Sequence, residues 1–82
     1  MGRTVASFTQ LIYKEEEEWR RFRRALRKED KECLDRLFAY ARMHAAECAY
    51  SGRLLPFDAM VISMLIELLK RVEKLEMTIP DS

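Results

Sequence analysis

Residues 56–77 read PFDAMVISMLIELLKRVEKLEM, and this stretch decides the fold. Its apolar positions recur at helical spacing, and Pro56 suits the first turn of a helix, where its missing N–H loses no partner. A first stripe along this predicted helix carries Phe57, Val61, Met64, Leu65, Leu68, Val72 and Leu75. A second stripe beside it carries Ile62, Ile66 and Leu69. Together the stripes widen the apolar arc to about 200°, where about 100° is the usual minimum.

An arc this wide exceeds what two companion helices of one chain can cover. We therefore expect the first stripe to lie in the core, and Ile62, Ile66 and Leu69 to contact another copy of the chain across a symmetric interface. This pattern predicts a homo-oligomer, with a dimer favoured. The alternative is that the N-terminal arm of the same chain covers the whole arc.

The first predicted helix begins at Ser7, which forms a capping box with Gln10, and it ends near Lys28. Acidic residues precede a cluster of arginines along it, and then acidic residues return. This order fits two helix dipoles joined near residue 29. One continuous helix over residues 8–50 is the alternative, because no Gly or Pro interrupts that range.

The second predicted helix covers residues 31–50 and turns back along the first in a helical hairpin. Asp30 is a favourable N-cap for it, and Gly52 can take the left-handed conformation that ends a helix. Its inward positions are Leu34, Leu37, Phe38, Ala41, Ala45 and Cys48. The sequence thus predicts an all-α chain of three helices, a hairpin plus a strongly apolar third helix, that forms an oligomeric bundle.

The composition indicates a single helical domain over residues 1–82, with a frayed start at 1–6 and a tail at 78–82. Only 2 Gly and 2 Pro occur, and 49% of the residues are hydrophobic and 35% charged, which favours helices. The formal net charge is +1, so no overall field attracts nucleic acid or an anionic membrane. Without a signal peptide or an apolar stretch of about 20 residues, we expect a cytoplasmic protein that does not associate with membranes.

Glu15 interrupts the apolar stripe of the first helix, and in a hairpin that turns near residue 29 it would lie level with His44. A partly buried carboxylate needs a partner, and an imidazolium supplies one. We therefore expect a buried Glu15–His44 pair. The alternative is a metal site with further ligands from Glu18, Glu47 and Cys48, although the order His-x-x-Glu departs from the Glu-x-x-His units of carboxylate-bridged bundles. No cofactor is predicted.

A basic face on the first helix offers a phosphate-binding surface. It consists of Arg20, Arg23, Arg24 and Arg27. Nucleic-acid binding through this face is an alternative function. Acidic residues lie close on both sides in the sequence and weaken the attraction for phosphate, so a solvated helix end with local ion pairs is favoured.

No arrangement of residues points to catalysis. His44 has no Ser or Cys nucleophile with a third orienting residue, and no Gly-rich phosphate loop occurs. Cys33 and Cys48 are predicted on the apolar side of one helix, about 22 Å apart and too distant for a disulfide. We interpret the chain as a non-enzyme, a self-associating structural or interaction protein whose first helix is offered to a protein partner.

Residues 19–30, WRRFRRALRKED, and residues 55–59, LPFDA, resemble a family of short uncharacterised prokaryotic helical proteins. The resemblance extends over about residues 8–76. It implies a compact three-helix unit. Because no activity is assigned to that family, it implies no functional residues.

Overall fold

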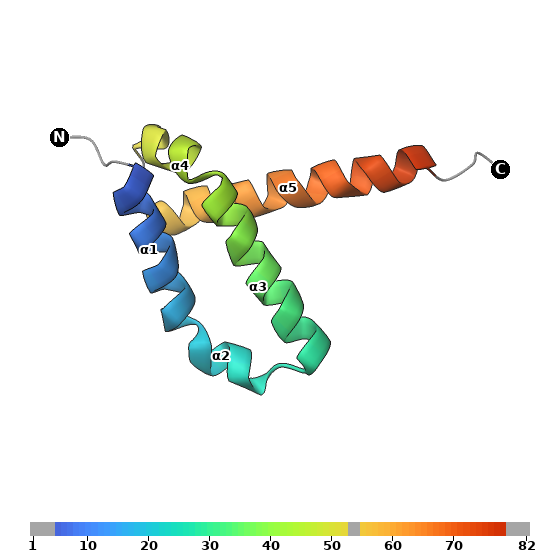
Figure 1. The fold of residues 1–82 in the computed structure, drawn as a ribbon, viewed down its shortest axis with the longest axis horizontal. Helices are drawn as coiled ribbons and strands as arrows, with labels where there is room; N and C mark the ends of the chain where they lie inside the picture. Colours follow the sequence, from blue (N-terminus) through green and yellow to red (C-terminus); the bar gives the residue numbers. More distant parts are fainter. Residues whose placement is uncertain (1–4, 53–54, 79–82) are drawn as a thin grey trace.

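The computed structural model describes residues 5–52 and 55–78, and every regular element in these ranges is an α-helix. The helices are α1 (Val5–Glu18), α2 (Arg20–Ala25), α3 (Lys28–Met43), α4 (Ala45–Ser51) and α5 (Pro56–Thr78). α1 and α3 run antiparallel with α2 at the corner between them, and α5 crosses the open end of this hairpin and projects beyond it (Figure 1). α4 packs against both α1 and α5. No described helix is long and apolar enough to cross a membrane.

The three-helix prediction is wrong in its count, because two of the predicted helices are broken at one residue. Trp19 separates α1 from α2 with φ −93° and ψ 9°, and His44 separates α3 from α4 with φ −109° and ψ 22°. At both breaks the side chain contacts α5. The Trp19 ring stacks on Phe57 with 6.0 Å between the ring centroids, and the imidazole of His44 binds Glu67.

The helix boundaries differ from the predicted ones at the N-terminal caps. α1 begins before Ser7, which lies inside the helix, and residues 1–4 lie outside the described residues. Leu26 and Arg27 are extended, with ψ 158° and 162°, so the single helix over residues 8–50 is wrong. α3 starts directly after them, which places Asp30 in its first turn, where an acidic side chain complements the dipole.

The C-terminal end of the second predicted helix and the start of the third agree with the sequence. Gly52 has φ 63° and ends α4 in the left-handed conformation, and Pro56 begins α5. A Cβ at Gly52 would meet no atom within 4 Å, so its backbone conformation rather than space favours glycine there.

Two ion pairs confirm that the hairpin turns near residue 29. Nη1 of Arg42 on α3 lies 2.9 Å from the Glu16 carboxylate on α1. Arg23 on α2 donates two hydrogen bonds of 2.9 Å to the carboxylate of Asp35 on α3. The two partners in each pair are equally distant from residue 29 along the chain, so these contacts record the register of an antiparallel hairpin.

The core lies where the hairpin, α4 and the first half of α5 meet. Its buried apolar residues are Phe8, Ile12, Phe38, Ala41, Ala45, Cys48, Ala59, Met60 and Met64. These include four of the six inward positions predicted for residues 31–50, and the other two, Leu34 and Leu37, pack against the core.

The predicted core stripe of α5 is largely wrong. The residues that α5 buries are Ala59, Met60, Ser63, Met64 and Glu67. Leu65, Leu68, Val72 and Leu75 of the predicted stripe are exposed. The reason is geometric, because α5 crosses the hairpin instead of lying along it. A helix of 23 residues is about 34 Å long, so its buried residues all lie in its first half. Every residue from 68 to 78 is exposed, although Arg71 still stacks on Tyr40 of α3.

Candidate functional site

The outer side of α5 carries a continuous row of apolar side chains, which we call the α5 apolar face. It comprises Val61, Ile62, Leu65, Ile66, Leu68, Leu69, Val72 and Leu75. The predicted interface residues all belong to it, with exposed fractions of 57% for Ile62, 46% for Ile66 and 57% for Leu69. Seven of these eight residues are exposed and Val61 is half-buried, so the described helices do not shield the row.

The buried side and the apolar face lie on opposite sides of α5. Successive residues advance by about 100° around a helix, which places Met60, Ser63 and Glu67 toward the hairpin and Leu65, Leu68 and Val72 away from it. The wide apolar arc in the sequence therefore combines two surfaces. One packs in the core of the chain, and the other faces solvent.

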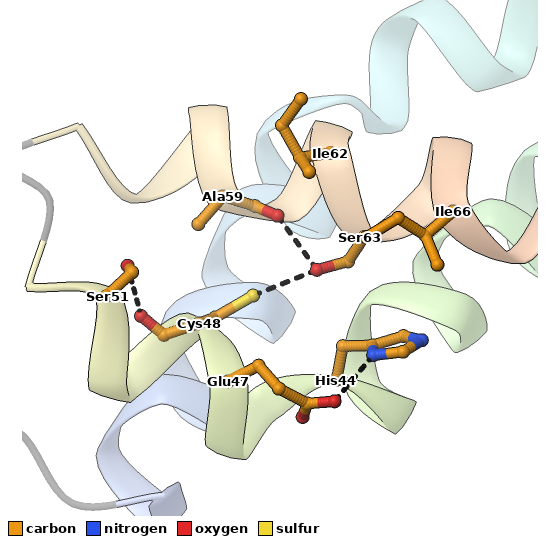
Figure 2. A pocket seen from close by; sticks show the side chains of 8 residues that line it. All are labelled: His44, Glu47, Cys48, Ser51, Ala59, Ile62, Ser63 and Ile66. Carbon is orange, nitrogen blue, oxygen red and sulfur yellow. Dashed lines mark hydrogen bonds and ion pairs between the residues drawn. The ribbon is translucent and has the colours of Figure 1, made fainter.

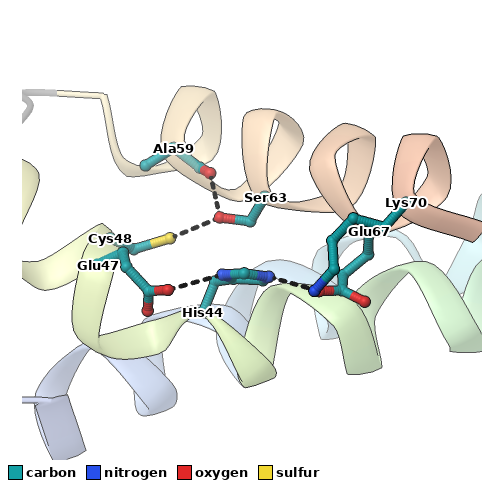
Figure 3. A network of polar contacts seen from close by, with 7 residues as sticks. All are labelled: His44, Glu47, Cys48, Ala59, Ser63, Glu67 and Lys70. Atoms are coloured by element: carbon teal, nitrogen blue, oxygen red, sulfur yellow. Dashed lines mark hydrogen bonds and ion pairs between the residues drawn. The ribbon is translucent and has the colours of Figure 1, made fainter.

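A polar network surrounds His44 where α4 meets α5 (Figure 3). Its Nδ1 lies 2.9 Å from Oε2 of Glu47, and its Nε2 lies 2.9 Å from Oε2 of Glu67. The two carboxylates, Glu67 above all, raise the pKa of His44, so the imidazolium donates to both. Glu67 also accepts a hydrogen bond of 3.1 Å from Lys70, and His44 and then Lys70 lower the pKa of its carboxyl group.

This arrangement suits a structural cation better than a catalytic base. With both ring nitrogens bound to carboxylates, the imidazole of His44 has no open nitrogen that could take a proton from a substrate or bind a metal. The network joins α4 to α5 and neutralises Glu67, whose side chain is only 5% exposed.

Cys48 lies close to this network and is held by a different partner. Its Sγ lies 3.2 Å from Oγ of Ser63, and the Ser63 hydroxyl donates to the carbonyl oxygen of Ala59 at 2.8 Å. The Cys48 thiol is therefore the donor to Ser63. Among the described residues the Cys48 thiol makes no hydrogen bond to the His44 imidazole, and only the backbone N–H of Cys48 donates to the His44 carbonyl oxygen, at 2.9 Å, so the geometry that would activate a thiol nucleophile is not formed there.

An open groove of about 390 Å³ lies between α4 and α5 beside the network (Figure 2). Its lining residues are His44, Glu47, Cys48, Ser51, Ala59, Ile62, Ser63 and Ile66. Ile62 and Ile66 belong both to the groove and to the α5 apolar face. The two surfaces are therefore continuous, and a partner packed on the α5 apolar face would also border the groove.

Residues 1–82 match a family described as a domain of unknown function (DUF8156). The chain belongs to this family. No curated protein and no solved structure matches it. The DUF8156 assignment agrees with the resemblance of residues 19–30 and 55–59 to a family without assigned activity, and it extends over the whole chain.

The Glu15–His44 pair predicted for this DUF8156 chain is wrong. Glu15 accepts a hydrogen bond of 2.9 Å from Nε1 of Trp19, and His44 binds carboxylates on α4 and α5. The hairpin register was predicted correctly, but the helix break turns His44 toward α5. The carboxylate of α1 that binds α3 is that of Glu16, whose partner is Arg42.

The structure does not bring the predicted metal ligands together. Glu15 and Glu18 line a second groove, of about 310 Å³, between α1 and the start of α5, whereas His44 lines the groove beside α4. No group of three or more His, Cys, Asp or Glu side chains within residues 5–52 and 55–78 is arranged to hold a metal ion. Cys48 is buried as predicted, whereas Cys33 is exposed, against the prediction.

The four arginines of the predicted phosphate-binding face differ in whether a carboxylate of the chain already binds them. Arg23 is bound to Asp35, and Arg20 lies 2.7 Å from the Glu17 carboxylate. Arg24 and Arg27 are exposed near the α2 corner and have no carboxylate partner within the described ranges. Half of the predicted face is therefore already neutralised.

Glu67 is the central residue of the network, and the sequence analysis missed it. It is the only charged residue in VISMLIELL, residues 61–69, and an isolated carboxylate within an apolar helix needs a buried partner. That signal was available. The identity of the partner was not, because His44 lies between α3 and α4, and these helices contact α5 only in the folded chain.

Proposed function

We propose that this DUF8156 protein is a non-enzymatic, self-associating structural or interaction module, and that a second copy of the chain covers the α5 apolar face. The observation that carries the proposal is the exposure of Ile62, Leu65 and Leu69, at 57%, 54% and 57%, on one side of one helix. Fully burying one exposed Leu or Ile side chain contributes about 1.5–3 kcal/mol. A contiguous apolar row of this kind is typical of an interaction surface.

A second copy is the occupant that the spacing favours. Five residues of the α5 apolar face are spaced alternately four and three positions apart along the chain. We call them the seam: Val61, Leu65, Leu68, Val72 and Leu75. This heptad spacing lets two identical helices interlock along their length. The hairpin and α4 pack on the opposite side of α5, so they leave the seam accessible.

The expected affinity is moderate. The α5 apolar face has eight side chains in each copy, fewer than the roughly 20–30 residues per side of a standard stable interface. We therefore expect a dissociation constant on the order of micromolar, and the protein concentration in any test must span that value.

Light scattering from about 1 to 300 μM tests the proposal. We expect the mass to rise from 9.8 kDa toward twice that value as the concentration increases. Leu65→Lys places a charge in the row through which the copies pack and should keep the chain at 9.8 kDa over the whole range.

The matched control is Met77→Lys, because Met77 lies on the same helix, is 87% exposed and falls outside the α5 apolar face. This variant should associate like the wild type, and circular dichroism should show both variants to be equally helical. A wild type that remains monomeric at 300 μM, on the order of 100 times the expected dissociation constant, would remove the proposal.

Nucleic-acid binding is our second candidate, supported by the exposed corner around α2. Arg21, Arg24, Arg27 and Lys28 lie there without an ion pair among the described residues, next to acidic side chains in the first turn of α3. If the corner binds phosphates, the fluorescence anisotropy of a labelled duplex should rise with protein and fall steeply with salt, and Arg24→Glu should abolish the rise. An anisotropy that is flat at low salt excludes this candidate.

A further inference from the structure

Building on the proposed self-association, we infer that two copies pair through α5 in parallel and in register, as a short two-stranded coiled coil. The seam extends from Val61 to Leu75, which is about four helical turns or 21 Å. Asp58 occupies the heptad position before Val61, and a carboxylate there ends the seam on that side.

Charges beside the seam favour the parallel arrangement. Arg71 and Glu76 flank it on opposite edges and are five residues apart. In a parallel, in-register pair this spacing brings Arg71 of each copy to Glu76 of the other, so symmetry forms the ion pair twice. Within the chain, the guanidinium of Arg71 stacks over the Tyr40 ring of α3, 4.8 Å from the ring centroid.

In an antiparallel dimer, two registers pair most of the seam residues of one copy with those of the other. Each of them creates a mismatch. Pairing Leu68 with Val72 of the second copy brings Arg71 against Arg71, two like charges. Pairing Leu65 with Leu68 of the second copy brings Leu75 against Asp58, an apolar side chain against a carboxylate. The parallel register avoids both contacts. It places the two Asp58 carboxylates at the same level, but they lie beyond Val61, where the seam ends.

The shape of the chain permits the parallel arrangement. The second half of α5 projects beyond the other helices (Figure 1), and its residues from 68 to 78 are all exposed. The hairpin and α4 pack on the side of α5 that carries Met60, Ser63 and Glu67, and α3 borders the seam only at its Arg71 edge. Two copies can therefore place their hairpins at the same end while their projecting helices run together.

Disulfide trapping tests the orientation. Leu75→Cys is made in a Cys33→Ser background, because Cys33 is exposed and would form unrelated links, whereas Cys48 is buried. In a parallel dimer the two introduced thiols face each other across the seam, within the roughly 7 Å between Cα atoms that a disulfide needs. Mild oxidation should convert most of the protein to a covalent dimer on a non-reducing gel.

Lys74→Cys in the same background is the control, because it is the neighbouring exposed position but lies on the side of α5 away from the seam. It should remain largely uncrosslinked.

A second experiment exchanges the two charges that flank the seam, those of Arg71 and Glu76. Glu76→Arg should weaken association several-fold, and adding Arg71→Glu should restore it, as expected for a direct ion pair between copies.

The outcomes separate this inference from the proposed function. If light scattering shows a dimer but Leu75→Cys does not crosslink, parallel pairing is overturned and self-association stands. If the protein is monomeric throughout, both are overturned. Equal crosslinking at positions 74 and 75, or no rescue by the charge exchange, also contradicts the parallel register.

Discussion

Met60→Ala should lower the free energy of unfolding by about 2–5 kcal/mol, the usual cost of truncating a fully buried Met, Leu or Ile. Met60 is 1% exposed and is one of the two largest side chains that are fully buried. At roughly 0.05–0.15 kcal/mol per residue, 82 residues correspond to about 4–12 kcal/mol of total stability. The variant should therefore lose a large share of it, and part of the population should unfold at 37 °C.

Met77→Ala provides the matched comparison, since it removes the same atoms from a side chain that is 87% exposed. We expect a change within about 0.5 kcal/mol. Urea denaturation followed by circular dichroism, at one fixed protein concentration, measures both. Equal losses for the two variants would show that Met60 does not hold α5 on the hairpin.

Wild-type stability should be greatest between about pH 4.5 and 6.5, and the His44 network is the reason. The contacts with Glu67 and Glu47 raise the pKa of His44 above its ordinary 6.5, so their stabilisation is fully present below pH 6.5 and is lost as the pH rises through the folded-state pKa. The pKa values of Glu47 and Glu67 are lowered from 4.5, so their stabilisation is present above that value and is lost as the pH falls through their folded-state pKa values.

His44→Ala should flatten the alkaline side of this profile and destabilise the chain more at pH 6 than at pH 9, because Glu67 keeps only Lys70 as a partner. The chain contains one histidine, so the change between pH 6.5 and 8 reports on His44 alone among the side chains. Urea midpoints measured across this range give the profile. A profile for His44→Ala that runs parallel to that of the wild type would contradict the role of the network.

Glu67→Gln supplies an independent check, because it removes the charge but keeps the shape of the side chain. The pKa of His44, followed by NMR, should fall toward 6.5 in this variant, since Glu67 is the main cause of its elevation. An unchanged titration midpoint would place the cause elsewhere.

Local features of the sequence predicted the local features of the fold. The helical class, the end of α4 at Gly52 and the start of α5 at Pro56 follow from periodicity and from the backbone preferences of Gly and Pro. The turn of the hairpin near residue 29 followed from the reversal of charge. Periodicity did not reveal the breaks at Trp19 and His44, because both residues are compatible with a helix and each break depends on a contact with α5.

The candidate site was predicted only in part. Ile62, Ile66 and Leu69 were correctly expected to lie outside the intrachain core, because an arc of about 200° is too wide for two companions. The division of that arc was predicted wrongly, since hydrophobicity alone does not say which side of an apolar helix faces the core. Ser63 and Glu67 face inward because partners lie opposite them, in Cys48 and His44.

By itself, the sequence determined that this chain is helical, that one helix ends at Gly52 and the next begins at Pro56, and that this helix carries a wider apolar arc than two companion helices cover. These properties depend on residues a few positions apart. Only the tertiary structure decided which side of α5 is buried, which carboxylate His44 binds and which leucines remain exposed. Those outcomes depend on the angle at which α5 crosses the hairpin, and that angle results from packing between segments distant in the chain.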